Sequence, residues 1–341
     1  MTLTELSYYF RKFLPYLILF FLIFLIFFYS IKLVLVYLDS NKTPTIYLDK
    51  SLGNISPPEI PQSTTSAGLK FTLDTIEGQP VTATETAKVF FLPQFNPRFG
   101  YREKIYLIAK SFGFDTEAIK HKLVDKLATF TDEEKTLSID ISNFNFKFDR
   151  KVDNELFSSS QLTIPSKPEI ENKAIDFLKK IGRYPDELGK GTTKIIYLKY
   201  NPGNQNFVNV TNRNQAQLVE VDFYRPNIDD FSIVTPKFFT SQNYVIMLFE
   251  GNDYTVIKSQ IAFFEKSEEQ VGVYPIKTGE EAWSELNNGK GMVVAGTEGQ
   301  KNIIIKKMKF GYFDPDIYQN YLQPVYVFLD DENFAGYVPA V

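Results

Sequence analysis

A short glycine-rich segment is the first place where residue types and spacing could support chemistry. Residues 189–193 read Gly-Lys-Gly-Thr-Thr, which contains the residue types of a phosphate-binding loop. A Walker A loop needs a glycine, four residues, and then Gly-Lys followed by serine or threonine. Here Gly182 lies too far upstream, and Gly191 occupies the hydroxyl position. The segment is therefore predicted to be a loop leading into a strand at Lys194–Tyr200.

Three acidic clusters offer the oxygen ligands that calcium prefers. They are Asp314-Pro-Asp316, Asp229-Asp230 and the run 330–332, Asp-Asp-Glu. None has the Asp-x-Asp-x-Asp-Gly spacing with a distant glutamate that marks a calcium loop. We interpret all three clusters as solvated turns.

Residues for nucleophilic or metal-assisted catalysis are scarce. The chain has no cysteine and one histidine, His121, which excludes a multi-histidine metal site and leaves little room for serine–histidine catalysis. His121 lies between two lysines in a predicted helix, as a surface histidine would. No Ser-x-x-Lys sequence occurs. We predict no catalytic residue, no cofactor and no metal, so the protein is interpreted as a non-enzyme, with an envelope hydrolase as the alternative.

Aromatic residues provide one candidate interaction site. Tyr312, Phe313, Tyr318 and Tyr321 surround a predicted turn and could form a recognition patch for another protein. The alternative is that these side chains cap the end of a sheet.

Composition limits the possible partners. The net charge is −4, and acidic and basic residues are interspersed, whereas a nucleic-acid partner would require a basic face. Without cysteines, the folded part must be held by core packing, which 32 phenylalanines and 20 tyrosines favour.

One apolar run near the N-terminus predicts a membrane anchor. Residues 13–38 are almost entirely apolar, and about 20 such residues span a bilayer as a helix. Pro15 is expected in the first turn, and Lys32 can extend to the interface. A cleaved signal peptide is the rival interpretation, but no A-x-A-like cleavage site follows. The sequence therefore predicts an uncleaved signal-anchor in contact with the lipid bilayer.

Charge beside this anchor predicts its orientation. Arg11 and Lys12 precede the helix, while acidic and basic residues are mixed on its other side. The positive-inside rule then puts residues 1–12 in the cytoplasm and everything after the anchor outside it. The predicted location is the plasma membrane, with one span and an extracytoplasmic C-terminal part.

A tether and three modules are predicted after the anchor. Residues 39–68 are rich in proline, serine and threonine, which predicts an extended linker. The first module is residues 69–160, with strands at 69–73 and 87–92, helices at 101–114 and 116–130, and two alternating strands joined by a turn at Ser142-Asn143.

The second and third modules repeat a helix followed by strands. The second, residues 161–270, opens with a predicted capping box at Ser166 and Glu169, followed by five strands. The third, residues 271–341, has a capping box at Thr278 and Glu281, a strand over 303–312 and a closing hairpin. Short helices alternating with runs of antiparallel strands predict an α+β fold of tandem modules.

The third module resembles a known family. The relevant residues are Glu281-Ala282 in the helix, Gly311-Tyr312 at a strand end, and Leu322-Gln-Pro-Val325 in the next strand. These residues are similar to the C-terminal domain of YycH/YycI-type regulatory proteins, although Gly279 stands where that group has lysine or serine. The resemblance implies PepSY-like modules on a signal-anchored bacterial protein that regulates another envelope protein without catalysis.

The expected function follows from the anchor and this resemblance. We predict a membrane-anchored extracytoplasmic protein with a regulatory or scaffold role, which binds a protein partner or itself. A surface module that binds peptide or glycan is a further alternative.

Overall fold

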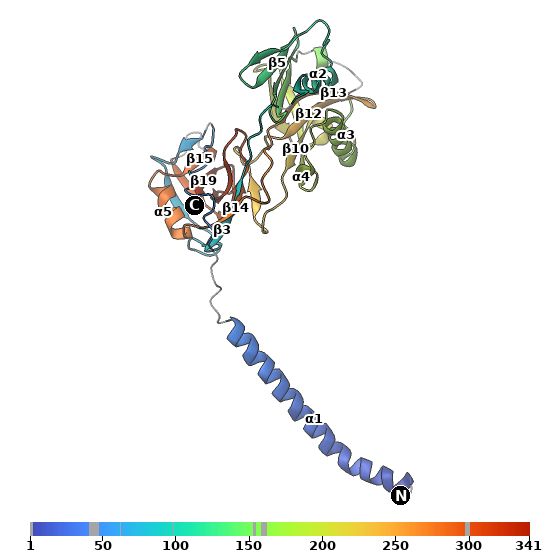
Figure 1. Cartoon of the computed structure of the whole chain (residues 1–341), viewed down its shortest axis with the longest axis vertical. Coiled ribbons are helices and arrows are strands. Elements are labelled where there is room, and N and C mark those ends of the chain that lie inside the picture. Colours follow the sequence, from blue (N-terminus) through green and yellow to red (C-terminus); the bar gives the residue numbers. More distant parts are fainter. Residues whose placement is uncertain are drawn as a thin grey trace. The chain divides into compact units, whose positions relative to one another are not determined.

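The computed structural model describes residues 3–40, 48–61, 63–97, 99–152, 155–157, 162–296 and 301–341 (Figure 1). The chain divides into two compact units, Met1–Tyr47 and Leu48–Val341. The second is called the folded unit below.

Helix α1 (Leu3–Ser40) contains the predicted anchor. Within it, Phe13–Leu35 has 23 residues and a mean hydropathy of 2.7, which is long and apolar enough to cross a membrane. This confirms a single N-terminal apolar helix. The helix begins ten residues earlier than predicted, at Leu3, so Pro15 lies in its interior and not in its first turn.

The larger sheet of the folded unit is entirely antiparallel among its nine described strands (Figure 1). In spatial order these are β4 (Lys122–Val124), β5 (Leu127–Thr131), β6 (Lys135–Asp140), β7 (Phe146–Arg150), β13 (Asp253–Ile261), β12 (Tyr244–Glu250), β10 (Leu218–Tyr224), β8 (Thr192–Asn201) and β9 (Asn206–Val210).

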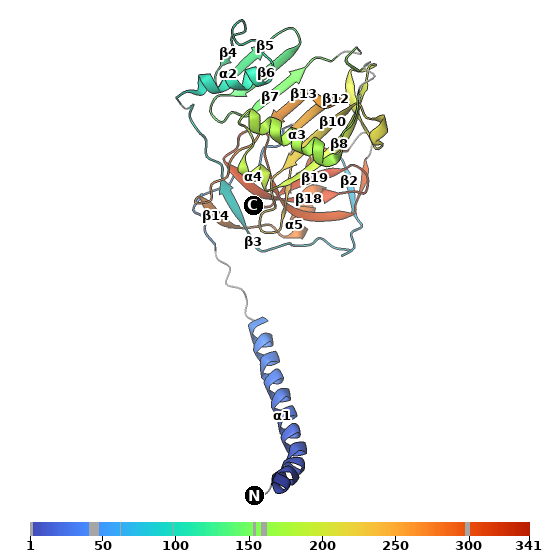
Figure 2. The ribbon, with the colours of Figure 1, turned by 90° about the vertical axis from the view of Figure 1, so that its right-hand side faces the viewer.

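Helices α2 (Tyr101–Ser111) and α3 (Lys167–Lys180) cover one face of this sheet, and Figure 2 shows α3 lying across its central strands. Strand β10 shows how the sequence builds the two faces. Its odd-numbered residues Val219, Val221 and Phe223 are buried in the core beneath the helices. Because successive side chains of a strand point to opposite faces, its even-numbered residues lie on the face away from α3.

The smaller sheet joins the C-terminal strands to segments from far along the chain. Its path is β1 (Thr64–Thr65), β15 (Met292–Ala295), β19 (Ala335–Pro339), β18 (Tyr321–Leu329), β17 (Lys307–Phe313) and β11 (Ser232–Val234), and β3 (Thr86–Phe91) pairs with both β18 and β14 (Val271–Pro275). All these pairs are antiparallel except β11 with β17. Strands β2 (Lys70–Leu73) and β16 (Asn302–Ile305) form a separate parallel pair.

Helix starts were predicted with mixed success. Helix α5 (Gly279–Asn287) has the predicted capping box, in which Thr278 Oγ1 accepts from the Glu281 amide at 3.2 Å and Glu281 accepts from the Thr278 amide at 2.7 Å. Helix α3 begins after Ser166 as predicted, but the Ser166 side chain makes no capping hydrogen bond. The antiparallel mixed fold is confirmed.

The helix predicted over residues 116–130 is wrong, because this segment forms the hairpin of β4 and β5. Its apolar residues fit a helical spacing, but Ala128 and Phe130 also alternate, and both are fully buried in the sheet. Asp125 adopts a positive φ of 52° in the turn between the strands. Pairing of β5 with β6 therefore overrides the weak helical pattern.

The predicted tether is also wrong over residues 48–68, which belong to the folded unit. Asp49 pairs with Val273, β1 pairs with β15, and Ser66 is fully buried with its hydroxyl donating to the Leu286 carbonyl at 2.7 Å. Backbone hydrogen bonding orders a segment whose own composition could not form a core. Residues 41–47 lie outside the described part of the chain.

The tandem arrangement is not confirmed. Strand β7 from the predicted first module pairs with β13 from the second, so both contribute to one sheet. Likewise β3, from the first, pairs with β14 and β18 of the third. The predicted strand over 303–312 is divided at Lys306 into β16 and β17, which join different sheets.

Candidate functional site

Two buried arginines lie where the larger and smaller sheets meet. Arg225 follows β10 and is 2% exposed. Its Nε donates to Asp314 Oδ1 at 2.7 Å, its Nη1 to Glu187 Oε2 at 3.0 Å, and its Nη2 to the Phe264 carbonyl. The guanidinium also lies over the Phe263 ring, 3.8 Å from the centroid. These contacts join β10, helix α4 (Asp186–Gly189) and the end of β17.

Arg183, just after α3, also lies near Phe263, with its Cζ 6.0 Å from the ring centroid. Its Nη2 donates to Asn145 Oδ1 at 2.5 Å and to the Phe263 carbonyl at 2.9 Å, while its Nε is buried without a hydrogen-bond partner. Burial lowers the pKa of Arg183 to about 10. Both arginines therefore fix the segment that leaves β13 for the smaller sheet.

The interpretation of Asp314 as part of a solvated turn is wrong. Asp314 is 1% exposed, and besides Arg225 it accepts from Gln242 Nε2 at 2.7 Å. Burial raises the pKa of the Asp314 carboxyl, while the Arg225 charge acts against that rise. Asp314 thus connects the arginine cluster to the loop that contains Gln242.

A pair of carboxyl groups lies at the other end of this loop. Glu220 and Asp222 are two residues apart on β10 and share the face away from α3. The two carboxyl groups are close enough to affect each other's pKa, and repulsion between adjacent negative charges favours a single proton on the pair. Burial, and then the Asp222 charge, raise the pKa of Glu220 to about 8. Asp222 Oδ2 also accepts from the Ser241 amide at 3.1 Å and from the Tyr224 hydroxyl at 3.2 Å.

Glu220 opens into a cavity of about 390 Å3, which we call the carboxyl pocket. This volume falls in the range of small-molecule sites, roughly 300–1,000 Å3. The pocket lies on the face of the larger sheet opposite α3, and it is closed by residues from the loop after β11 and from the segment after β17. Its lining comprises Pro61, Lys147, Glu220, Pro236, Lys237, Thr240, Ser241, Gln242, Tyr244, Ile246, Gln260 and Asp316.

Several unpartnered polar atoms lie in the lining of this pocket or on residues adjacent to it in sequence or by contact. Among the side chains that the structure describes, buried atoms without a hydrogen-bond partner include Asp222 Oδ1, Gln242 Oε1, Asn243 Nδ2 and Asp316 Oδ1. A buried polar atom left unpaired costs about 1–3 kcal/mol, so a cluster of them indicates a site completed by water or ligand. Sequence analysis missed this site, although the acidic pair on one face of a predicted strand was a visible signal.

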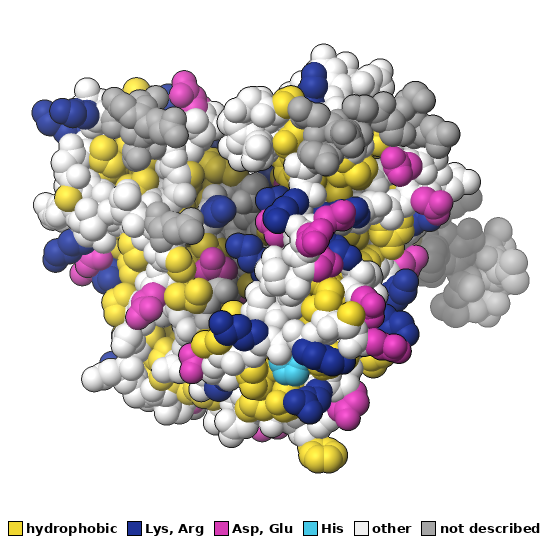
Figure 3. Space-filling view, turned by 90° about the horizontal axis from the view of Figure 1, so that it is seen from above, with side chains coloured by type: hydrophobic (Ala, Val, Ile, Leu, Met, Phe, Trp, Pro, Cys, Tyr) yellow, Lys and Arg dark blue, Asp and Glu magenta, His cyan; other side chains and the backbone are white. Residues whose placement is uncertain are grey.

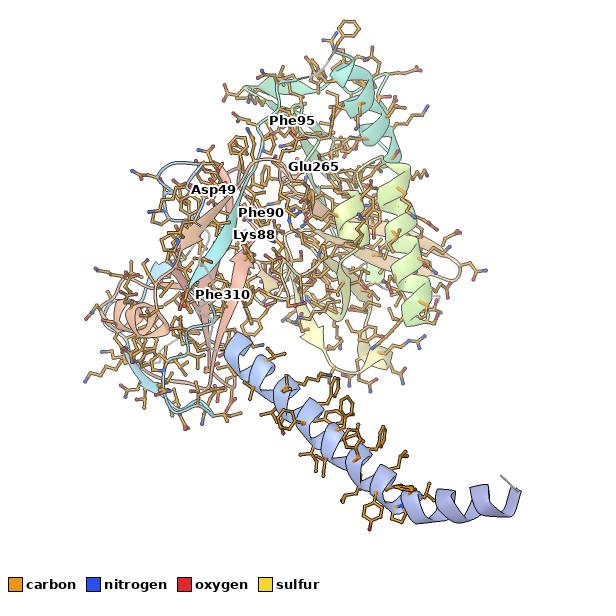
Figure 4. The ribbon with its side chains drawn as sticks, turned by 60° about the horizontal axis from the view of Figure 1, so that its bottom comes forward. Asp49, Lys88, Phe90, Phe95, Glu265 and Phe310 are labelled. Carbon is orange, nitrogen blue, oxygen red and sulfur yellow. The ribbon has the colours of Figure 1, made fainter. Side chains whose placement is uncertain are left out.

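A second, smaller cavity lies beside Arg183, with a volume of about 180 Å3. Phe95 and Glu265 are among its lining residues and are labelled in Figure 4. Lys88 and Phe90 lie two residues apart on β3 and, with Glu265, line an adjacent open groove (Figure 4). Opposite charges balance in this second cavity, and its buried arginine is already bonded to Asn145 and Phe263.

The predicted aromatic patch does not exist as an exposed surface. Tyr312 is 1% exposed and Phe313 is fully buried, because β17 points them into two different hydrophobic clusters. Tyr318 and Tyr321 are half-buried, and their hydroxyls donate to the carbonyls of Leu92 and Leu52 at 2.9 and 3.3 Å. The four side chains therefore anchor neighbouring segments.

The remaining predicted positions have structural roles. Of the segment predicted as a loop, only Lys190 and Gly191 connect α4 to β8, because Gly189 ends α4 and Thr192 begins β8. His121 is half-buried, with Nδ1 3.2 Å from the Tyr106 hydroxyl, and burial lowers its pKa. Asp229 pairs with Lys88 at 2.9 Å, and Asp330 accepts two backbone amides of its own turn. Within the described residues, no group of three metal-binding side chains is found.

The acidic pair differs in its arrangement from the two carboxyl groups of a glycoside hydrolase. Two carboxyl groups that hydrolyse a glycosidic bond stand about 5 Å or more apart, so that the sugar lies between them. Glu220 and Asp222 instead lie two residues apart on one strand, and Asp222 is fully buried, so it does not face a substrate. Asp222 therefore positions Glu220 and the Ser241 loop, while Glu220 faces the pocket.

Comparisons with known proteins give little further guidance. No protein-family model matches the chain, and no curated protein matches it. A solved structure of an uncharacterized protein from Eubacterium rectale ATCC 33656 is similar, with a TM-score of 0.32 and 10% sequence identity, covering 79% of this chain and 87% of that one. The function is therefore proposed from the chain's own residues.

Proposed function

We propose that this is a single-pass envelope protein that holds its folded unit outside the cytoplasmic membrane and binds a partner protein there, with a regulatory or scaffold role and no catalysis. The span at Phe13–Leu35 and the basic residues before it support the location and the orientation. The resemblance to YycH/YycI-type proteins supports a regulatory role. A membrane-bound or membrane-apposed protein is the partner that such an anchor favours.

The observation that carries the proposal is an exposed apolar edge on the larger sheet. Strand β4 is the end of the sheet order, so one side of its backbone has no neighbouring described strand. Val124 and Leu127 lie directly opposite each other in the hairpin and are 55% and 45% exposed. Leu123 beside them and Phe99 before α2 are also exposed. Exposed apolar side chains at an unpaired edge are typical of a protein-binding site.

Basic side chains surround this edge. Lys120, Lys122 and Lys126 flank the hairpin, and Figure 3 shows hydrophobic and basic side chains beside the histidine on this face. The arrangement favours an extended partner segment that presents apolar residues with acidic neighbours.

Photo-crosslinking tests the partner site. A photoreactive amino acid at Val124 or Leu127 of the full chain, in intact membranes, is expected to give a discrete crosslinked product. The double variant V124D/L127D should reduce recovery of that product by at least about ten-fold, because buried apolar contacts at an interface centre contribute more than 1 kcal/mol each.

The matched control is Ile76, an exposed apolar residue in a turn of the folded unit. Neither crosslinking at position 76 nor the I76D variant should affect the same product. Equal yields from positions 76 and 124, or no product from the hairpin, would contradict the assigned surface.

Thiol labelling tests the orientation. Because the native chain has no cysteine, a Thr64→Cys variant carries a single thiol, on an exposed side chain of β1. A membrane-impermeant maleimide is expected to label it in intact cells, whereas Ser7→Cys, before the span, should be labelled only after lysis. The reverse pattern would place the folded unit in the cytoplasm.

A further inference from the structure

We propose that the carboxyl pocket binds an uncharged, hydroxyl-rich ligand of the saccharide class. The proposal goes beyond protein binding at the β4 edge, and it uses a different face and different residues. It rests on the pocket's charge balance, on its unpartnered acceptors and on its mixed polar and apolar walls.

Charges around the pocket offset one another. Lys147 and Lys237 line it together with Asp316, and the Glu220–Asp222 pair has one negative charge when it holds one proton. These four groups sum to zero charge, and Lys194, which also acts on Glu220, lies outside the lining with its Nζ donating to the Phe239 carbonyl at 2.7 Å. A strongly anionic or cationic ligand would leave one sign uncompensated in a largely enclosed site, so a neutral ligand fits best.

The unpartnered atoms of the pocket lining are acceptors. Gln242 is 7% exposed, and its amide orientation is fixed because Nε2 donates to Asp314. Its Oε1 must therefore accept, and it has no donor. Asp316 Oδ1 is likewise a buried acceptor without a hydrogen-bond donor. A ligand or its bound water must supply hydrogen atoms here, which hydroxyl groups do without bringing charge.

The remaining walls suit the carbon faces of a sugar ring. Tyr244, Ile246, Pro61 and Pro236 line the pocket alongside its polar groups. A saccharide presents C–H faces between rings of hydroxyls, so it can contact an aromatic or proline surface while its edges hydrogen-bond. A pocket of about 390 Å3 is large enough to hold one or two sugar units.

Protonation of Glu220 should control the site. The pKa of Glu220 is raised to about 8, so below that pH Glu220 is mostly neutral, whereas above it two adjacent carboxylates repel each other. Other charged or titratable groups face Glu220 from the neighbouring elements: Lys194 on β8, Lys147 on β7, Tyr244 on β12, and Lys237 and Asp316 from the loops. The lysines reduce the pKa rise without abolishing it.

Saturation-transfer NMR on the full chain in lipid nanodiscs tests the proposal, since maltoside detergents carry sugar headgroups themselves. The probes are cellobiose, maltose and N,N′-diacetylchitobiose at pH 7. At least one is expected to bind saturably, and Asp316→Asn and Gln242→Ala should each weaken its binding at least ten-fold. The matched control is Glu332→Gln, an acid in an exposed turn, which should leave binding unchanged.

The shared proton gives a second readout. Native protein is expected to bind the sugar at least ten-fold more weakly at pH 9.5 than at pH 7, while Glu220→Gln, which stays neutral, should bind equally at both. Circular dichroism shows whether each variant is folded. The proposal is overturned if none of the three disaccharides binds, if spermidine or citrate binds instead, or if the pocket variants and the pH change leave binding unaltered.

Discussion

Replacement of Arg225 by methionine is expected to lower the free energy of unfolding by about 3–5 kcal/mol, the usual cost of removing one partner from a buried ion pair. Methionine keeps much of the length of the arginine side chain but cannot donate hydrogen bonds. Asp314 would then be buried with its charge unpaired, and the Phe264 carbonyl would lose its donor.

The size of this effect follows from the place of Arg225 in the fold. It contacts residues from α4, from the segment after β13 and from the end of β17, and its side chain is entirely buried. The ring of Phe263 packs against its face, so the methionine must also replace a cation–π contact.

Urea denaturation followed by tryptophan fluorescence measures the change, since Trp283 is the one tryptophan of the chain. The control is Lys88→Met, which removes an exposed ion pair with Asp229 and should cost less than about 1 kcal/mol. Adding Asp314→Leu to Arg225→Met should recover part of the loss, because it removes the unpaired charge. Similar losses for Arg225→Met and Lys88→Met would refute the central role of the arginine.

The arginine cluster could not be predicted from the sequence. Arg225 and Asp314 are 89 positions apart, and each is flanked by proline, which reads locally as a turn. Their burial depends on two sheets meeting, and no local pattern encodes that contact. The same reason explains why Tyr312 and Phe313 were predicted as surface residues beside a turn, although β17 has neighbours on both sides.

Features set by neighbouring residues were predicted well. The capping box at Thr278 and Glu281 and the start of α3 after Ser166 both depend on residues within a few positions. The error over residues 116–130 shows the limit of such patterns. Three apolar residues at helical spacing were outweighed by pairing with β6, which lies later in the chain.

The carboxyl pocket could be predicted from the sequence only in part. Alternation predicts correctly that Glu220 and Asp222 share a face of β10, but it says nothing about which loops cover that face. Lys237, Gln242 and Asp316 reach the pocket from segments after β11 and β17. The acidic pair was therefore visible in the sequence, while the cavity was not.

Gly191→Ala is expected to lower the free energy of unfolding by about 3 kcal/mol, at the upper end of the cost of overpacking. A Cβ atom at this position would lie 1.8 Å from the Tyr224 carbonyl oxygen and 3.0 Å from the Arg225 carbonyl carbon. Both neighbours are backbone atoms at the end of β10, so neither can rotate away. The glycine that resembled part of a phosphate loop is thus required for the close approach of two chain segments.

Chemical denaturation of Gly191→Ala is compared with that of the control variant Gly203→Ala. The comparison separates the steric clash at position 191 from the general effect of replacing a glycine. The nearest atom to a Cβ at position 203 is a side-chain oxygen of Asn201 at 3.3 Å, which can move, so its effect should stay within about 0.5 kcal/mol. The double variant Gly191→Ala/Arg225→Met should cost less than the sum of its parts, because the clash already displaces the backbone that positions Arg225. Strict additivity would show that the close approach at Gly191 and the arginine cluster stabilise the junction of the sheets independently.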